Sequence, residues 1–282
     1  MGAWNAWHES NAWHWDGAKI LPFDGGVPLS DRGFRYGQHV FESIAIRQGV
    51  TLLAKEHLEI LKISAKQLGI PCSRTLLASL RSFLASESFP DGMLRLYVTA
   101  GPGAPGSPVK KPSCYLAWSE AEFPTPAEMK KGMTLTLLKK SFPGEGWGVK
   151  SGNYAAHLEA FQLAWDAGAD EGIVCNEQGR IISCAMGNLL LWLPDKKKQT
   201  TLCTPSPTLG ARSGAVLNWV QRQTAVEERV LKSFDLRRAV ALAVTNSRLG
   251  VMPVRMLDGK NLSYPDLSLT LAYDYLQAHD LS

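Results

Sequence analysis

Apolar and polar positions along the chain predict two α/β domains, the first of which ends near residue 120. Strand-like runs separated by turns fill residues 13–53, and the last two, Phe41–Arg47 and Val50–Leu53, form a predicted hairpin around Gln48-Gly49. Apolar residues at helical spacing follow over residues 55–68. The same reasoning predicts one more helix and two strands, over residues 74–86, 94–99 and 113–118.

A linker over residues 121–130 is predicted from its Pro- and Thr-containing sequence, and residues 131–282 form the predicted larger domain. Strands and helices are mixed along this second domain. Predicted strands cover residues 133–138, 172–176, 180–184, 188–193, 242–245 and 252–255, and predicted helices cover the stretch before Ala167, the stretch from Gly210 to about Thr224, and residues 264–278.

Composition narrows the class of protein. With 282 residues and 45% apolar residues, the chain can build one large or two ordinary cores. The net charge is +4, and the basic runs Lys196–Lys198 and Lys110-Lys111 are too short to indicate nucleic acid. Anionic small-molecule ligands are compatible with this balance.

Cysteine usage and hydropathy predict a cytoplasmic protein. The five cysteines are scattered and contain no C-x-x-C pair, which indicates a reduced chain without disulfides or a metal site. The first residues show no signal-peptide pattern, and no apolar run reaches the roughly 20 residues that span a bilayer. Trp4, Trp7, Trp13 and Trp15 indicate buried aromatic anchors or a subunit contact.

Lys150 is the residue with the most distinctive chemistry. It stands just ahead of a helical pattern, within Val149-Lys150-Ser151-Gly152-Asn153-Tyr154. A lysine amine is a strong nucleophile only when it is deprotonated, and partial burial favours that state. Lys150 is therefore a candidate Schiff-base lysine, the alternative being a solvated surface lysine.

Several motifs in order resemble the fold-type IV pyridoxal-phosphate enzymes, the class IV aminotransferase family. This family includes branched-chain aminotransferases, D-amino-acid aminotransferases and aminodeoxychorismate lyases. The motifs are Asp31–Gly37 leading into Phe41-Glu42, His57-Leu58, Lys150–Tyr154, Gly168–Glu171, Gly187–Leu189, Thr204-Pro205, and Thr245–Ser247 before Pro253-Val254.

The resemblance implies a small N-terminal α/β domain, a larger C-terminal domain with a barrel-like sheet, and a homodimer that binds pyridoxal 5′-phosphate (PLP). Lys150 would form the internal aldimine and then shuttle protons. Tyr154, four residues on, would lie one helical turn away and bond the cofactor's O3′, with core packing as the alternative.

A phosphate cup is expected where residues 204–213 run into a helix start, because free N–H groups and the helix dipole there favour an anion. Ala211 and Arg212 lie in that segment, and Thr245 and Asn246 add donors at a strand end. An ordinary capped helix and turn are the alternative.

Two positions depart from the family pattern. Ile60 stands where the family's first helix has a phosphate-binding arginine, and Ser183, five residues before Asn188, stands where a glutamate faces the pyridine nitrogen. A serine hydroxyl cannot hold the ring nitrogen protonated as a carboxylate does. Three alternatives follow: Arg212 replaces the arginine and Ser183 bonds a neutral pyridine; the cofactor binds weakly; or the cofactor is lost.

Substrate class follows from the branches of the family. Ala100 takes the place of the arginine that the D-amino-acid branch carries, and Asn246-Ser247 before Pro253 is more similar to the lyases. A neutral ring also favours elimination over transamination. We therefore expect an aminodeoxychorismate lyase, with a branched-chain type aminotransferase and a cofactor-free binding protein as alternatives. The expected substrate-facing residues are Arg35, His39, Phe41, Ser43 and Arg248; ordinary packing or turn roles are the alternative for Phe41, Ser43 and His39.

Overall fold

The computed structural model describes residues 11–144, 148–194, 199–262 and 265–281. The basic run Lys196–Lys198 and the residues Trp4 and Trp7 lie outside the described residues. The chain divides into two compact units, Met1–Glu122 with Val149–Asn153, and Phe123–Gly148 with Tyr154–Ser282. The sequence-based boundaries put residues 149–153 in the second domain, whereas the structure groups them with the first because they pair with one of its strands.

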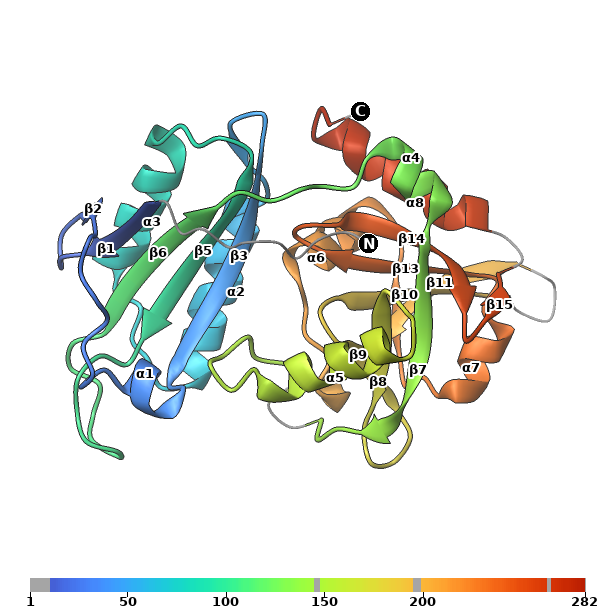
Figure 1. The fold of residues 1–282 in the computed structure, drawn as a ribbon, viewed down its shortest axis with the longest axis horizontal. Coiled ribbons are helices and arrows are strands. Elements are labelled where there is room, and N and C mark those ends of the chain that lie inside the picture. The colour runs from blue at the N-terminus through green and yellow to red at the C-terminus, as the bar shows by residue number, and fades with distance from the viewer. Residues whose placement is uncertain (1–10, 145–147, 195–198, 263–264, 282) are drawn as a thin grey trace. The chain divides into compact units, whose positions relative to one another are not determined.

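The first unit is an antiparallel sheet of six strands in the order β2-β1-β6-β5-β3-β4, with helices α2 and α3 on one face (Figure 1). The short helix α1 (Arg32–Tyr36) precedes β3. The bounds are β1 Asn11–Trp15, β2 Ile20–Pro22, β3 His39–Arg47, β4 Val50–Thr51, α2 Ala54–Gln67, α3 Arg74–Ser86, β5 Gly92–Thr99 and β6 Ser113–Ser119.

Successive side chains along each strand point to opposite faces of this sheet. Val40 and Ile44 of β3 are fully buried, in one core cluster with Leu58 and Leu61 of α2. Phe41 and Ser43 point to the opposite face, because they alternate with these core residues. The hairpin and both helices predicted from the sequence are present in this unit.

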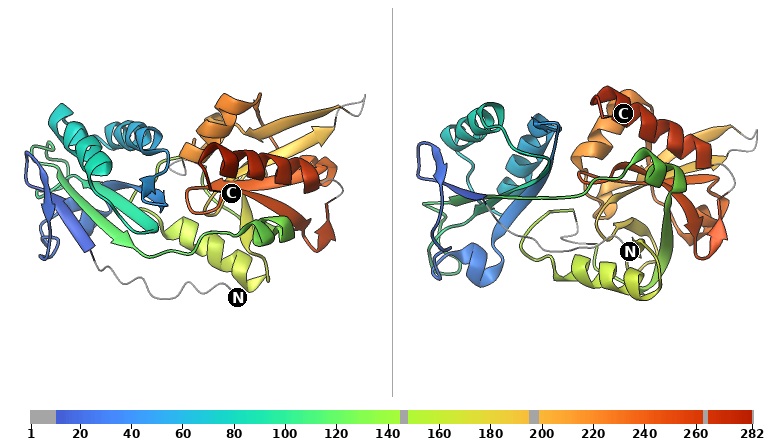
Figure 2. Two further views of the ribbon diagram at one scale, coloured as in Figure 1. Left: turned by 90° about the horizontal axis from the view of Figure 1, so that it is seen from above. Right: turned by 45° about the horizontal axis from the view of Figure 1, so that its top comes forward.

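The second unit is built on a curled nine-stranded sheet, ordered β12-β11-β10-β13-β14-β7-β8-β9, with β15 paired to β14. Strands β14, β7 and β8 run parallel, and β10, β13 and β14 run antiparallel. Helix α8 lies along β14 (Figure 2). The strand bounds are β7 Met133–Ser141, β8 Glu171–Cys175, β9 Ile181–Cys184, β10 Asn188–Pro194, β11 Thr200–Pro205, β12 Glu227–Arg229, β13 Ala241–Asn246, β14 Gly250–Leu257 and β15 Lys260–Asn261; the helix bounds are α4 Pro126–Lys131, α5 Ala155–Asp166, α6 Ala215–Gln223, α7 Ser233–Arg238 and α8 Pro265–Ala278, with a 3-10 turn η1 at Pro207–Leu209.

Two stretches of this unit contain structure that the sequence predictions placed differently. The linker over residues 121–130 contains most of α4, which begins with a capping box between Thr125 and Glu128. The helix expected to open at Gly210 begins five residues later, at Ala215, because Gly210 has a left-handed backbone (φ 96°) and Gly214 is the N-cap.

All five cysteines are free. Within the described ranges, every helix is too short or too polar to cross a lipid bilayer.

Candidate active site

Lys150 lies in an extended segment that pairs with β3. Phe41 N donates to Lys150 O (2.9 Å) and Gly152 N donates to His39 O (3.0 Å), while Ser151 forms an isolated bridge with Val40. The expectation that Lys150 and Tyr154 lie one helical turn apart is therefore wrong, since α5 begins only after Tyr154. Pairing with β3 satisfies the backbone groups that a helix would otherwise use.

The amine of Lys150 lies on the face of the sheet that α2 and α3 leave open. Its Nζ is 3.2 Å from Ser43 Oγ and 4.8 Å from the centre of the Phe41 ring. Phe41 in turn stacks on Tyr97 of β5, with the ring centres 5.8 Å apart. Two of the predicted substrate-facing residues, Phe41 and Ser43, thus contact the predicted Schiff-base lysine directly.

His39 is fixed beside the same segment. Its Nδ1 is 3.2 Å from Gly33 O, so Nδ1 carries the proton that this carbonyl accepts. A Cβ on Gly152 would stand 2.4 Å from His39 Cε1, so only glycine allows this close approach. Arg35, by contrast, is exposed on α1, with its guanidinium 5.0 Å from the centre of the Tyr36 ring.

In the second unit, Asn188 ties the start of helix α6 to the sheet. Its Nδ2 donates to Arg212 O, and its Oδ1 accepts from Gly214 N at 3.2 Å. Thr245 lies directly opposite Asn188 in the β10–β13 ladder, so both side chains point to the same face. Thr245 is 1% exposed, and its Oγ1 is one of two buried side-chain polar atoms without a hydrogen-bond partner among the described residues.

This arrangement suits a phosphate group. Helix α6 begins without a side-chain cap, which leaves its first amides as donors. A Cβ on Gly214 would stand 3.5 Å from Arg212 Nη2, so the guanidinium of Arg212 lies against the same helix end. The buried Thr245 hydroxyl, which has no partner among the described residues, offers a further donor.

The other residues predicted for this region have different surroundings. Asn246 Oδ1 accepts from Leu249 N (2.8 Å) and so closes the β13–β14 turn. Arg248 is exposed in that turn, near Glu128, and Ala211 is buried beside Arg212.

Tyr154 and Ser183 each bond a residue of the turn that joins β9 to β10. Tyr154 Oη donates to Met186 Sδ at 3.7 Å, and the Tyr154 ring stacks on His157 at 4.3 Å. Ser183 Oγ donates to Gly187 O at 2.7 Å. In this structure the hydroxyl proton is directed to a carbonyl, and the side chain carries no charge. That Ser183 bonds a neutral pyridine stays a prediction.

Glu171 is a buried carboxyl group to which the sequence analysis gave no separate role. It is 2% exposed and accepts hydrogen bonds from Gly172 N, Ala185 N and Met186 N, at 2.9, 3.0 and 3.0 Å. Burial raises the pKa of Glu171 to about 7, against the three amides, which lower it. An acidic residue at the start of an otherwise apolar run is the signal that could have identified it.

Ile60, at the position of the family's arginine, is buried in α2. The neighbouring His57 pairs with Glu42 through a 2.7 Å contact between His57 Nδ1 and Glu42 Oε2. These residues belong to the helix-covered side of the first sheet, so Ile60 supplies packing at this position.

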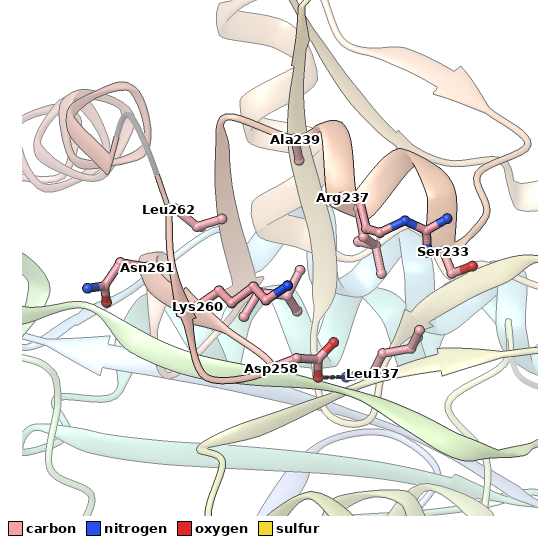
Figure 3. A pocket seen from close by; sticks show the side chains of 10 residues that line it. Leu137, Ser233, Arg237, Ala239, Asp258, Lys260, Asn261 and Leu262 are labelled. Atoms are coloured by element: carbon pink, nitrogen blue, oxygen red, sulfur yellow. Dashed lines mark hydrogen bonds between the residues drawn. The ribbon is translucent and has the colours of Figure 1, made fainter.

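A pocket of about 460 Å³ opens elsewhere on the second unit (Figure 3). It lies among β7, α7, β14 and β15, and Asp258 at its edge accepts from Leu137 N at 2.9 Å. It contains none of the residues predicted for PLP or substrate.

Comparisons with known proteins define the class. A hypothetical aminotransferase from Mycobacterium tuberculosis in its PLP-bound form superimposes with a TM-score of 0.74 at 21% identity, covering 96% of this chain and 100% of that one. The fold is that of the fold-type IV PLP enzymes.

The family model described as amino-transferase class IV matches residues 39–257, and the chain belongs to this family of PLP enzymes. The putative branched-chain-amino-acid aminotransferase of Methanocaldococcus jannaschii is 28% identical over 84% of this chain and 84% of its own length. The aminodeoxychorismate lyase of Vibrio harveyi is 26% identical over 81% and 86%. The protein is therefore an enzyme, and the alternative of a cofactor-free binding protein is set aside.

Proposed function

We propose that the protein is a PLP-dependent lyase of the aminodeoxychorismate lyase type, which releases pyruvate and leaves 4-aminobenzoate for folate synthesis. The observation that carries this proposal is that an uncharged serine, Ser183, stands where a carboxylate is expected to face the ring nitrogen, with its hydroxyl bonded to Gly187 O. The similarity to the Vibrio harveyi lyase supports it. A cytoplasmic homodimer is part of the same proposal.

The residues present suit the cofactor. Lys150 Nζ would hold it covalently, and Tyr154 would hydrogen-bond the cofactor's O3′. Thr245, Arg212 and the first amides of α6 would hold its phosphate. Asn188 would position that helix end through Gly214. When bound, PLP supplies the electron sink for bond cleavage at the substrate's α-carbon.

Ser183 bears on which reaction follows. Its hydroxyl donates to Gly187 O and carries no charge, so Ser183 would bring no negative charge to a ring nitrogen. A carboxylate would keep that nitrogen protonated, and a serine lone pair does not. An uncharged ring is a poorer electron sink than a protonated one. It disfavours transamination, which needs a carbanion that lasts until it is reprotonated. Elimination tolerates the change better, because the leaving group is expelled sooner.

The face around Lys150 suits a cyclic substrate. The stacked pair Phe41 and Tyr97 provides a flat apolar surface, and Ser43 Oγ lies beside the Lys150 amine. Lys150 Nζ would carry the proton that the substrate's α-carbon loses. Ala100 brings no cation to its turn, so the exposed Arg35 and Arg248 are the residues we assign to substrate carboxylates.

A branched-chain type aminotransferase is the second candidate, favoured by the Methanocaldococcus jannaschii relative. Single-turnover absorbance spectra with a panel of amino acids separate the two. If the protein is the lyase, it should release pyruvate from aminodeoxychorismate. Every amino acid in the panel should then convert the cofactor to its amine form only slowly. Fast conversion by a branched-chain amino acid would establish the aminotransferase instead.

A further inference from the structure

We propose that Glu171 is the positioning residue for Tyr154, acting through the backbone of Ala185 and Met186. This rests on the proposed function, in which the Tyr154 phenol bonds the bound cofactor. Glu171 touches neither substrate nor cofactor in this proposal; it fixes the turn on which the phenol depends.

Both oxygens of the Glu171 carboxylate are used in holding this turn. Oε1 accepts from Gly172 N and Ala185 N, and Oε2 accepts from Met186 N. In the described part of the chain, no lysine, arginine or histidine side chain pairs with it. The ionised carboxylate accepts from all three amide donors. A protonated carboxyl group would instead direct its own O–H towards an amide N–H.

The two residues that Glu171 holds are the two that contact the ring pair at the start of α5. Ala185 O accepts from His157 Nδ1 at 2.8 Å, and Met186 Sδ accepts from Tyr154 Oη at 3.7 Å. The Tyr154 and His157 rings stack at 4.3 Å with an angle of 12° between their planes. A shift of the turn therefore moves the sulfur partner of the phenol and the carbonyl partner of its stacked neighbour together.

Among the described residues, few titratable groups face the Glu171 carboxylate. Cys184 of β9 is buried, and its thiol pKa is raised by burial and by Glu171. His157 of α5 contributes the ring that bonds Ala185 O, and the partner of Glu171 on β7 is the apolar Leu135. A titration observed at Met186 near neutral pH is therefore assigned to Glu171 or His157, and Glu171→Gln distinguishes them.

The test is a double-mutant cycle on PLP affinity, measured by fluorescence titration of the apoprotein. Glu171→Gln should weaken PLP binding about tenfold in the wild-type background and have little effect in the Tyr154→Phe background, because neighbours that act together are not additive. Glu177→Gln, which changes an exposed carboxylate in the turn after β8, is the matched control and should change nothing. An equal loss in both backgrounds would overturn the proposal.

A second readout needs no PLP. In wild-type apoprotein carrying a ¹³C-methyl label on methionine, the Met186 methyl resonance should shift as pH is raised through neutrality, and in Glu171→Gln that shift should disappear. A pH-independent Met186 signal, or one that persists in Glu171→Gln, would overturn the role of Glu171. Failure of wild-type protein to bind PLP would defeat the proposed function. The pH titration of Met186 would then be the test of whether Glu171 holds the turn at Ala185 and Met186.

Discussion

Thr245 lies opposite Asn188 across two paired strands, and the two side chains differ in how they are satisfied. Asn188 bonds both Arg212 O and Gly214 N, whereas the buried Thr245 Oγ1 has no partner among the described residues. A buried hydroxyl without a partner is unfavourable by about 1–3 kcal/mol. The fold therefore retains a donor at the helix end where an anion would supply the missing acceptor.

Thr245→Val should separate stability from binding. Valine has the same shape without the hydroxyl, so the free energy of unfolding of the apoprotein should rise by about 1 kcal/mol while PLP affinity falls by about tenfold. Urea unfolding and PLP titration measure the two effects. Thr204→Val is the matched control: Thr204 Oγ1 is buried but donates to Leu189 O at 2.9 Å, so this variant should lose stability. A Thr245→Val protein that binds PLP like wild type would contradict the phosphate assignment.

Lys150 is expected to carry the visible absorption of the holoenzyme. Lys150→Ala removes the amine beside Ser43 and Phe41, so the band that borohydride abolishes in wild type should be absent. Lys139→Ala, an exposed lysine on β7, should keep the band and its borohydride sensitivity. A borohydride-sensitive band that is retained in Lys150→Ala would mean that another lysine forms the Schiff base.

The sequence predicted most elements whose signal is local. The helices α2 and α3 follow from apolar spacing along Leu58–Leu61 and Leu76–Leu80, and the capping box at Thr125 and Glu128 was readable although it was assigned to a linker. Partners distant in sequence were not readable. The α6 start depends on Asn188, which lies 26 residues from Gly214, and the Lys150 segment depends on pairing with β3.

The same distinction applies to the site. Lys150, Asn188 and Thr245 were identified because a family pattern surrounds them. Glu171 belongs to the same motif, but the three amides it holds come from β8 and from the turn after β9, so its role appears only in three dimensions. The hydrogen bond of Ser183 to Gly187 likewise depends on turn geometry.

Glu171 should make stability depend on pH. The pKa of Glu171 is raised to about 7 in the folded protein, against 4.5 for the unperturbed group. Between these values the folded state binds more protons than the unfolded state, so the contribution of Glu171 is present below about pH 4.5 and is lost as pH rises through 7. The loss is on the order of 3 kcal/mol.

Urea unfolding of wild type and Glu171→Gln at pH 5, 6, 7 and 8 measures this effect. The wild-type free energy of unfolding should fall relative to that of Glu171→Gln across this range, because glutamine does not titrate. A constant difference between the two proteins would show that the folded-state pKa is not raised.

Ser183→Glu should move the chemistry towards transamination. A carboxylate there could accept from a protonated ring nitrogen, and the improved electron sink should raise the rate of conversion of the cofactor to its amine form by about tenfold or more. Ser183 is 5% exposed, so the larger side chain will reduce stability, and PLP occupancy must be measured alongside the rate. Ser183→Ala is the control: it loses the bond to Gly187 O without adding a charge, and it should not accelerate the conversion. If Ser183→Glu binds PLP fully and converts no faster than Ser183→Ala, the residue at this position does not set the choice between elimination and transamination.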